Sequence, residues 1–259
     1  MMNVLIGDIG NTVTKICLIE IKTLKIKKIV YFNSASILSK NFLEKKIKKI
    51  VKKKSINKIA LFSSVVSKYH LKLKKFLKNK YKIKLKEIKE NDINKIVKIN
   101  IQNKKQVGSD RIANAAGVFK RYKSNCIVLD FGTATTFDVV TKNGIYKGGI
   151  IAPGVNLSLK GLVKAADQIP VFSIKKQKRI VGKNTIEALR SGFYWGYTGL
   201  INNIILKIEK ETKKKYKIIF TGGYADLFKT SITRSFTIDR NITIKGVIEI
   251  FRENKKYLI

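Results

Sequence analysis

The chain has 259 residues, of which 44% are apolar, so it can bury a substantial core in one large domain or two small ones. Its formal charge of +38 favours anionic partners, but the lysines are spread along the chain among isoleucine and asparagine, which indicates a low-GC genome and a solvated surface more than a specific nucleic-acid site. No apolar run approaches the roughly 20 residues of a membrane span, no signal-peptide pattern opens the sequence, and both cysteines lie in apolar runs. We therefore expect a cytoplasmic protein without a membrane partner or a disulfide.

The first expected element is a β-hairpin with a polar turn between apolar runs at 4–7 and 16–19. The turn residues are Asp8, Ile9, Gly10, Asn11, Thr12, Val13, Thr14 and Lys15. A glycine backbone, hydroxyls and a lysine are groups that cradle phosphate, and the carboxylate indicates a metal ion or its water shell. An ordinary polar turn is the alternative, because Asp, Gly, Asn and Thr are all common in turns.

The next part of the chain is predicted to alternate between strands and helices. Strands are predicted at 25–33, 58–66 and 82–90, and an amphipathic helix with a lysine-rich outer face at 36–54. Ser67 is expected to cap the helix that follows, and His70 on that helix is predicted to lie at the surface. Residues 91–105 are too polar for a clear prediction.

A run of small residues after Val107 predicts a closely packed helix that begins near Gly108-Ser109-Asp110-Arg111. Ser109 or Asp110 is the expected N-cap, which is the common role of these residue types. The alternative is that Asp110 points into a cleft, accepts a proton from a substrate hydroxyl, and leaves Arg111 to hold an anionic substrate group.

A second polar turn repeats the plan of the first. The apolar strand predicted at 126–129 leads into Asp130-Phe131-Gly132-Thr133-Ala134-Thr135-Thr136, and a third strand is predicted at 144–151, as in the first half. Asp8 is matched by Asp130, and by the same spacing Thr14 is matched by Thr136. An internal repeat of this kind predicts two similar α/β domains whose turns face each other across a cleft.

The remaining elements are expected to be mainly helical. Helices are predicted at 155–166 and 186–214, a linker at 175–181, a strand at 217–221, and a strand or helix at 243–251. Asn184 or Thr185 is the expected cap of the long helix, and Thr185 is also a candidate ligand contact. The glycine turn at 222–223 is a further place where backbone can approach a ligand closely.

Taken together, these motifs resemble those of the type III pantothenate kinases. The matching segments, in one order along the chain, are DIGNTVTK at 8–15, VGSDRIANAAG at 107–117, LDFGTATTFD at 129–138, GGIIAPG at 148–154 and KNT at 183–185. The resemblance implies an α/β fold of the actin/Hsp70/sugar-kinase superfamily, with two RNase H-like (actin-like ATPase) domains, mixed β-sheets flanked by helices, and an active site in the interdomain cleft. We expect the N-terminal domain at 1–118 and the C-terminal domain at 119–259.

The resemblance also implies roles for single residues. Asp8–Lys15 and Thr133 would bind ATP, and Asp130 would ligate a monovalent cation, K⁺ or NH₄⁺. Pantothenate would be bound by Gly108, Ser109, Asp110, Arg111 and Thr185, with Asp110 as the proton acceptor. Mg²⁺ and a homodimer are implied as well. Ile101 stands where the family usually has a tyrosine, so a tyrosine contact to the substrate is not expected at that position.

The implied reaction is the phosphorylation of pantothenate by ATP to 4′-phosphopantothenate, the first step of coenzyme A biosynthesis. Phosphoryl transfer requires positioning and charge neutralisation more than covalent chemistry, which suits two polar turns and one carboxylate base. Two alternatives remain open at this point. One is a non-catalytic regulatory or nucleic-acid-interacting protein on the same fold, and the other is a phosphatase of the same superfamily.

Overall fold

The computed structural model describes residues 2–51, 55–230 and 232–259. These residues divide into two compact units, and both units draw on separated parts of the chain. The first comprises Met1–Lys123, Asn143–Lys147 and Asn241–Ile259, and the second comprises Ser124–Lys142 and Gly148–Arg240. The C-terminal residues therefore pack with the first unit. The domain division at 118/119 stays a prediction, because compact units and family domains are different divisions of the chain.

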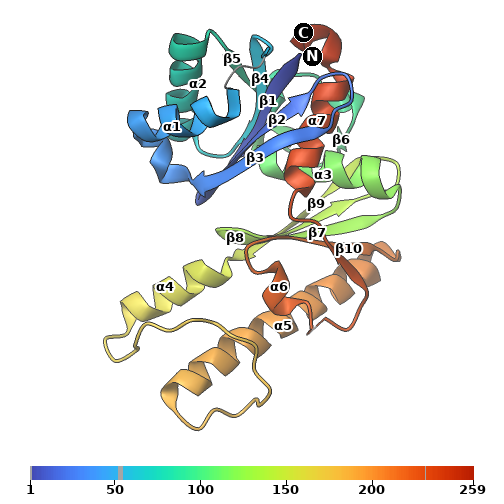
Figure 1. Cartoon of the computed structure of the whole chain (residues 1–259). Coiled ribbons are helices and arrows are strands. Elements are labelled where there is room, and N and C mark those ends of the chain that lie inside the picture. The colour runs from blue at the N-terminus through green and yellow to red at the C-terminus, as the bar shows by residue number, and fades with distance from the viewer. Residues whose placement is uncertain (1, 52–54, 231) are drawn as a thin grey trace. The chain divides into compact units, whose positions relative to one another are not determined.

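The first unit is built on a five-stranded mixed sheet in the order β3-β2-β1-β4-β5. Its strands are β1 (Asn3–Ile9), β2 (Val13–Glu20), β3 (Ile26–Asn33), β4 (Ile59–Ser64) and β5 (Lys84–Glu87). Helices α1 (Lys40–Val51) and α2 (Ser67–Tyr81) cover one face, where Leu5, Leu43 and Leu73 share a fully buried core. Helices α3 (Ser109–Tyr122) and α7 (Ile242–Glu253) lie on the other face (Figure 1).

Short elements complete this unit. They are the 3-10 turns η1 (Ser34–Leu38), η2 (Ile88–Glu90), η3 (Ile93–Lys95) and η4 (Lys104–Gln106), strand β6 (Lys98–Ile99) and helix α8 (Lys255–Leu258). The unpredicted segment 91–105 is thus a series of short turns. Side-chain oxygens of Asp92 and Asn103 cap two of them, which is why no long-range periodicity marks this part of the sequence.

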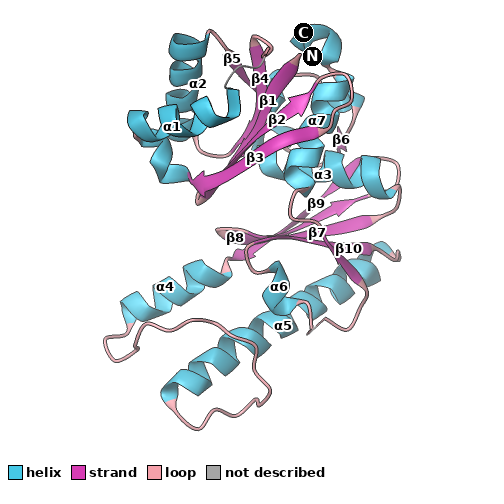
Figure 2. Ribbon diagram, viewed as in Figure 1, coloured by secondary structure: helices cyan, strands magenta, loops and turns pink. Residues whose placement is uncertain are grey.

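The second unit contains most of a six-stranded sheet in the order β11-β10-β7-β8-β9-β6. Its strands are β7 (Cys126–Phe131), β8 (Ala134–Val140), β9 (Ile145–Pro153), β10 (Lys217–Gly222) and β11 (Phe236–Ile238). The first residues of β9, up to Lys147, belong to the first unit. Its helices are α4 (Val155–Ala165), α5 (Thr185–Thr212) and α6 (Ala225–Phe228) (Figure 2). Ile127 and Phe220 from the strands pack with Ile201 and Ile205 of α5 in one buried core.

The two sheets follow the same plan, which confirms the predicted internal repeat. In each, a β-hairpin is extended by a third strand on one side and by parallel strands on the other, so that β3-β2-β1-β4-β5 matches β9-β8-β7-β10-β11. Strand β1 is parallel to β4 just as β7 is parallel to β10. The two polar turns therefore occupy equivalent places in two α/β sheets flanked by helices, which is the predicted fold class.

The helix predicted at 36–54 is divided in the structure. A 3-10 turn ends at Leu38, Ser39 is extended, and α1 follows. The Ser39 hydroxyl accepts a hydrogen bond from the Phe42 backbone at 3.3 Å, and this local bond offers the chain a helix start in place of a continuous helix. Residues 52–54 of the predicted helix lie outside the described residues.

His70 is buried, so the prediction of a surface histidine was wrong. His70 is only 9% exposed, and the Nδ1 atom of its imidazole ring has no hydrogen-bond partner. Burial holds the pKa of His70 below its usual value, and Lys74 adds to this effect. The lysines around it in the sequence belong to the outer face of α2, whereas His70 shares the inner face with Leu73 and Leu77.

Within the described residues, no helix has the length and apolar character needed to cross a membrane.

Candidate functional site

The first polar turn joins β1 to β2 and lies at the carboxyl end of β1. Asp8 is the buried penultimate residue of β1 and pairs with Lys15 across the hairpin. The Gly10 backbone N–H donates to the Val13 carbonyl at 3.2 Å and closes the turn. Asn11 and Thr12 are exposed at its tip, where backbone and side-chain donors can meet an anion.

A chain of hydroxyl groups fixes the shape of this turn. The Ser34 hydroxyl donates to the Gly10 carbonyl at 2.7 Å, and the Thr14 and Ser34 hydroxyl oxygens are 2.8 Å apart. Thr14 and Ser34 are both fully buried. Ser34 comes from η1, far from the turn in sequence, so sequence patterns gave no signal for it.

The carboxyl end of β4 lies beside the same turn. Asp8 is in parallel register with Ser63, and the Val65 backbone N–H donates to the Ile9 carbonyl at 3.1 Å. Ser63 is fully buried and its hydroxyl has no hydrogen-bond partner. The sequence predicts only a buried strand for this segment. The carboxyl ends of neighbouring parallel strands are a frequent ligand-binding location in α/β sheets.

Helix α3 begins next to this strand end. Gly108, not Ser109 or Asp110, is the N-cap, and no side chain caps the helix. A methyl group on Gly108 would lie 3.7 Å from Val65 Cγ1 and only 2.5 Å from Asp110 Oδ1. The Gly108–Arg111 motif is therefore close to the Asp8–Lys15 turn within one unit, and Asp110 folds back toward Gly108.

The Asp110 carboxylate is held in place by the helix backbone. Oδ1 accepts a hydrogen bond from the Arg111 N–H at 2.8 Å. Burial raises the pKa of Asp110 above its usual value, and the Arg111 hydrogen bond and positive charge oppose this rise only in part. A carboxylate with a raised pKa is a better proton acceptor than an ordinary surface aspartate.

Ser109 packs beneath this turn against the end of β5. It is 3% exposed, and a side-chain hydrogen bond from Ser109 lowers the pKa of Glu87 while burial raises it more strongly. Glu87 Oε2 also accepts a hydrogen bond from the Lys89 backbone at 2.8 Å. The start of α3 is thus supported by Glu87 at the end of β5, a contact that the sequence did not reveal.

The second polar turn joins β7 to β8 in the second unit. Asp130 is half-buried and pairs with Thr136, and the Gly132 N–H donates to the Ala134 carbonyl at 3.0 Å. Thr133 is exposed at the tip. A methyl group on Gly154 would lie 2.0 Å from the Thr133 carbonyl oxygen, so Gly154, between β9 and α4, packs directly on this turn.

The pairing corrects one detail of the predicted repeat. Thr14 lies opposite Ile9, whereas Thr136 lies opposite Asp130, so these two threonines are not equivalent. Thr135, opposite Phe131, is the structural counterpart of Thr14. The second turn is shorter, and matching by sequence spacing alone therefore shifted the register by one residue.

The glycine turn after β10 lies beside the second polar turn. Thr221 pairs with Asp130, and the Gly223 N–H donates to the Phe131 carbonyl at 3.0 Å. Gly222 has a positive φ of 86°, and a methyl group there would lie 2.6 Å from the Phe131 backbone. Glycine is required at this position, because no other residue tolerates both the backbone conformation and the close contact.

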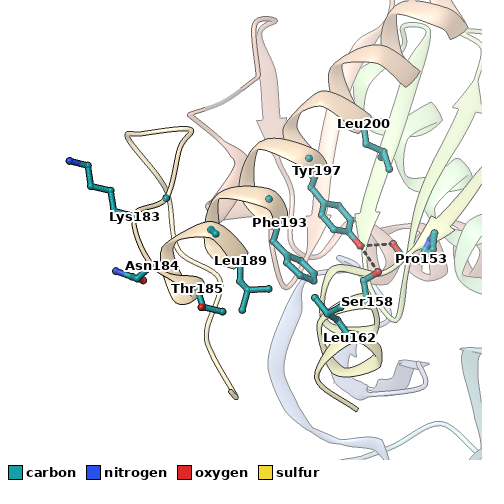
Figure 3. A pocket seen from close by; sticks show the side chains of 14 residues that line it. Pro153, Ser158, Leu162, Lys183, Asn184, Thr185, Leu189, Phe193, Tyr197 and Leu200 are labelled. Atoms are coloured by element: carbon teal, nitrogen blue, oxygen red, sulfur yellow. Dashed lines mark hydrogen bonds between the residues drawn. The ribbon is translucent and has the colours of Figure 1, made fainter. Parts of the chain in front are cut away.

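Thr185 is the first residue of α5, in the second unit. Asn184 is the N-cap of α5, and its side chain accepts a hydrogen bond from the Glu187 N–H at 2.9 Å. Of the two predicted caps, Asn184 and Thr185, the structure therefore uses Asn184. Thr185 lines a pocket of about 900 Å³ between α4 and α5 (Figure 3). The side chains of Leu162, Leu189 and Phe193 lie toward one another in this pocket, whereas Lys183 points away from it.

Tyr197 of α5 lines this pocket and forms hydrogen bonds at its wall. The Tyr197 hydroxyl is 2.8 Å from the Ser158 hydroxyl and donates to the Pro153 carbonyl at 3.2 Å (Figure 3). Pro153 precedes Gly154, which contacts the Thr133 turn. Within the described residues, no cluster of three or more His, Cys, Asp or Glu side chains is arranged to hold a metal ion.

Comparisons with known proteins give a family for this arrangement. The sequence model of the type III pantothenate kinases matches residues 4–207. A type III pantothenate kinase of Pelagibacter ubique is 51% identical over 248 residues, which cover 95% of this chain and 97% of the relative. The chain belongs to the type III pantothenate kinase family. It is accordingly a kinase with the α/β fold of that family.

One further relative agrees with this membership, and one solved structure shares the fold. A type III pantothenate kinase of Paramagnetospirillum magneticum is 37% identical over 195 residues, 75% of each chain. The crystal structure of a Campylobacter jejuni protein assigned to the Baf family of transcriptional activators superposes with a TM-score of 0.62 at 22% identity, over 97% of this chain and 99% of that one. At that identity the second likeness concerns the fold alone. The roles of single residues in this type III pantothenate kinase stay predictions.

Proposed function

We propose that this chain transfers the terminal phosphoryl group of ATP to the primary hydroxyl of pantothenate, giving ADP and 4′-phosphopantothenate. Family membership gives the reaction class and the substrate pair. The observation that carries the assignment to particular atoms is the Asp110 carboxylate, which is half-buried, has a raised pKa, and lies at the start of α3 beside the carboxyl ends of β1 and β4.

Asp110 is the proposed proton acceptor. As the substrate oxygen bonds to phosphorus, its proton passes to the Asp110 carboxylate, and the bond between the transferred phosphorus and the ADP oxygen breaks. The hydrogen bond from the Arg111 N–H to Oδ1 fixes one oxygen of this carboxylate, so the other is the one that faces the substrate proton. The Arg111 side chain, next in sequence, anchors the substrate carboxylate through its planar donors.

The Asp8–Lys15 turn is proposed to hold the phosphates of ATP, and Thr133 is proposed as a further contact of the nucleotide. Exposed backbone at Asn11 and Thr12 supplies donors, and Lys15 supplies a positive charge. The donor set fits Mg²⁺, because carboxylate and hydroxyl oxygens are ligands it prefers, and Mg²⁺ is usually bound through one or two carboxylates together with the phosphates of its substrate. Asp8 would hold it, directly or through water. Bound Mg²⁺ supplies charge neutralisation at the phosphates.

Two finer assignments follow from the same family pattern. Asp130 is the proposed ligand of a monovalent cation, since its half-buried carboxylate stands at the second turn, beside the backbone carbonyls of the β7–β10 strand ends. Both cysteines are buried and free, which is consistent with the proposed location in the reducing cytoplasm.

A second copy of the chain is the proposed partner, with the α4–α5 pocket as part of the contact. Gly192, Gly196 and Gly199 line one side of α5, and a methyl group at each would meet no heavy atom within 4 Å. Small residues let another helix approach closely, and the apolar Leu189 and Phe193 beside them would be covered by it. In this dimer Thr185, at the pocket edge, would contact pantothenate.

The test is a coupled assay of ADP release by the purified full chain, with and without pantothenate and with K⁺ present or omitted. The expected result is ADP release that requires pantothenate, and a lower rate without K⁺. Phosphate release without pantothenate would favour a superfamily phosphatase. No turnover, together with DNA binding that persists at high salt, would favour a nucleic-acid-interacting protein. Light scattering of the wild type and of Phe193→Asp checks the dimer.

A further inference from the structure

Arg111 lies over an aromatic ring that no sequence motif indicated. Its guanidinium carbon is 5.8 Å from the centre of the Tyr146 ring, within the range of a cation–π contact. Both residues belong to the first unit. Arg111 is half-buried in the first turn of α3, and Tyr146 is only 1% exposed, so the contact is largely removed from water. Cation–π contacts are strongest when they are removed from water.

The ring itself is held rigidly. Tyr146 is the second residue of β9 and pairs with Ile99 of β6, and its carbonyl accepts a hydrogen bond from the Asn100 N–H at 3.0 Å. Gly144 immediately precedes the strand, its φ of 74° is in the left-handed region, and a methyl group there would lie 3.1 Å from the Ile96 carbonyl oxygen. Because the backbone is fixed and the side chain is fully buried, the surrounding atoms restrict the orientation of the Tyr146 ring.

A flat ring restricts a guanidinium in a specific way. A guanidinium plane that stacks on a ring face directs its N–H donors outward from its edge, in the geometry that a carboxylate accepts. A flexible arginine side chain would otherwise lose more conformational entropy when it binds a substrate anion. Asp110 precedes Arg111, so a fixed arginine also sets where the substrate lies relative to the proton acceptor.

We propose that Tyr146 is a positioning residue that orients Arg111 for the carboxylate of the substrate. This inference rests on the proposed function, in which Arg111 anchors pantothenate. It assigns to Tyr146 an effect on substrate affinity through the ring face, and no contact with the reacting atoms. The Michaelis constant for pantothenate therefore responds to Tyr146, while kcat and the Michaelis constant for ATP do not.

The experiment compares Tyr146→Phe with Tyr146→Met in steady-state kinetics and in calorimetric binding of pantothenate without ATP. Phenylalanine keeps the ring face, and the expected KM for pantothenate is within about threefold of wild type. Methionine fills the space without a π face, and the expected KM and Kd rise about 5–30-fold, the range that a desolvated cation–π contact gives. Tyr194→Met is the matched control, because Tyr194 is equally buried at 1% exposure but lies in the second unit.

A second series covers the case in which Tyr146→Met does not fold. Phenylalanine rings with one, two and three fluorine atoms have nearly the same shape but a progressively weaker π face. A stepwise rise in the KM for pantothenate along this series supports the proposal. Equal KM values for Tyr146→Phe and its fluorinated forms, or for Tyr146→Phe and Tyr146→Met, would overturn it. Failure of the proposed function is distinguished by the wild type, which would then show no pantothenate-dependent ADP release at all.

Discussion

Replacing Gly108 by alanine should move the proposed base without unfolding the chain. Gly108 has φ −59° and ψ 144°, a conformation that alanine adopts freely, so the backbone is not strained. The new methyl group would stand 2.5 Å from Asp110 Oδ1, and its next neighbours are at 3.7 Å. The carboxylate oxygen must therefore retreat about 1 Å to reach an ordinary contact of roughly 3.5 Å.

The magnitude follows from what the displaced oxygen does. Oδ1 leaves the Arg111 N–H, to which it is bonded at 2.8 Å, and the whole carboxylate turns. A misplacement of this size lowers the rate about 10²-fold, so we expect kcat/KM for pantothenate to fall by about that factor. The free energy of unfolding should change by less than about 1 kcal/mol, because only the end of a flexible side chain moves and a Gly→Ala change restricts the unfolded chain.

The assay combines steady-state kinetics with urea unfolding of Gly108→Ala. Gly161→Ala is the matched control, since no heavy atom lies within 4 Å of the added methyl group and the helix should gain up to about 1 kcal/mol. Gly108→Ala with the kcat/KM of wild type would refute the reasoning, because the carboxylate would then not need its observed position. A loss of unfolding free energy above about 2 kcal/mol would assign the effect to folding instead.

Three other substitutions test the site and its support. Asp110→Asn should lower kcat about 10²–10⁴-fold. Because burial raises the pKa of Asp110 above its usual value, the charged carboxylate destabilises the fold, so Asp110→Asn should also raise the melting temperature at pH 8, and this gain should shrink as the pH falls toward 4. Equal changes in melting temperature at both pH values would contradict this. Ser34→Ala leaves the buried Thr14 hydroxyl without its partner at 2.8 Å, so the unfolding free energy should fall by about 1–3 kcal/mol and the KM for ATP should rise, whereas Ser36→Ala should change neither. Gly246→Ala places a methyl group 1.7 Å from the Ala113 carbonyl oxygen where α7 crosses α3, so the helices must separate; calorimetry should show a destabilisation near or above the upper end of the roughly 1–3 kcal/mol typical of overpacking, and an unchanged melting temperature would show that the crossing is not tight.

The sequence determined the repeat and the chemistry of the turns. Strand β1 and strand β7 are apolar runs that end in Asp-x-Gly, and such runs can be recognised without any tertiary contact because the strand signal and the turn signal are both local. For the same reason the limits of β3 and α5 were predicted within a few residues. The limits of α7 were predicted equally well, but the sequence did not distinguish a strand from a helix there. The motif order was sufficient to indicate the family, which the comparisons confirm.

Only the tertiary structure decided which side chains support those turns. Ser34, Ser63 and Tyr146 come from segments with no motif. Strand pairing or a turn that folds back brings each of them to the site, and a local sequence pattern does not encode such long-range contacts. His70 was misplaced because lysines on the outer face of α2 hid the one inner polar position. Thr14 and Thr135 became equivalent only once the hairpin register was known, since the register depends on turn length and on which face is buried.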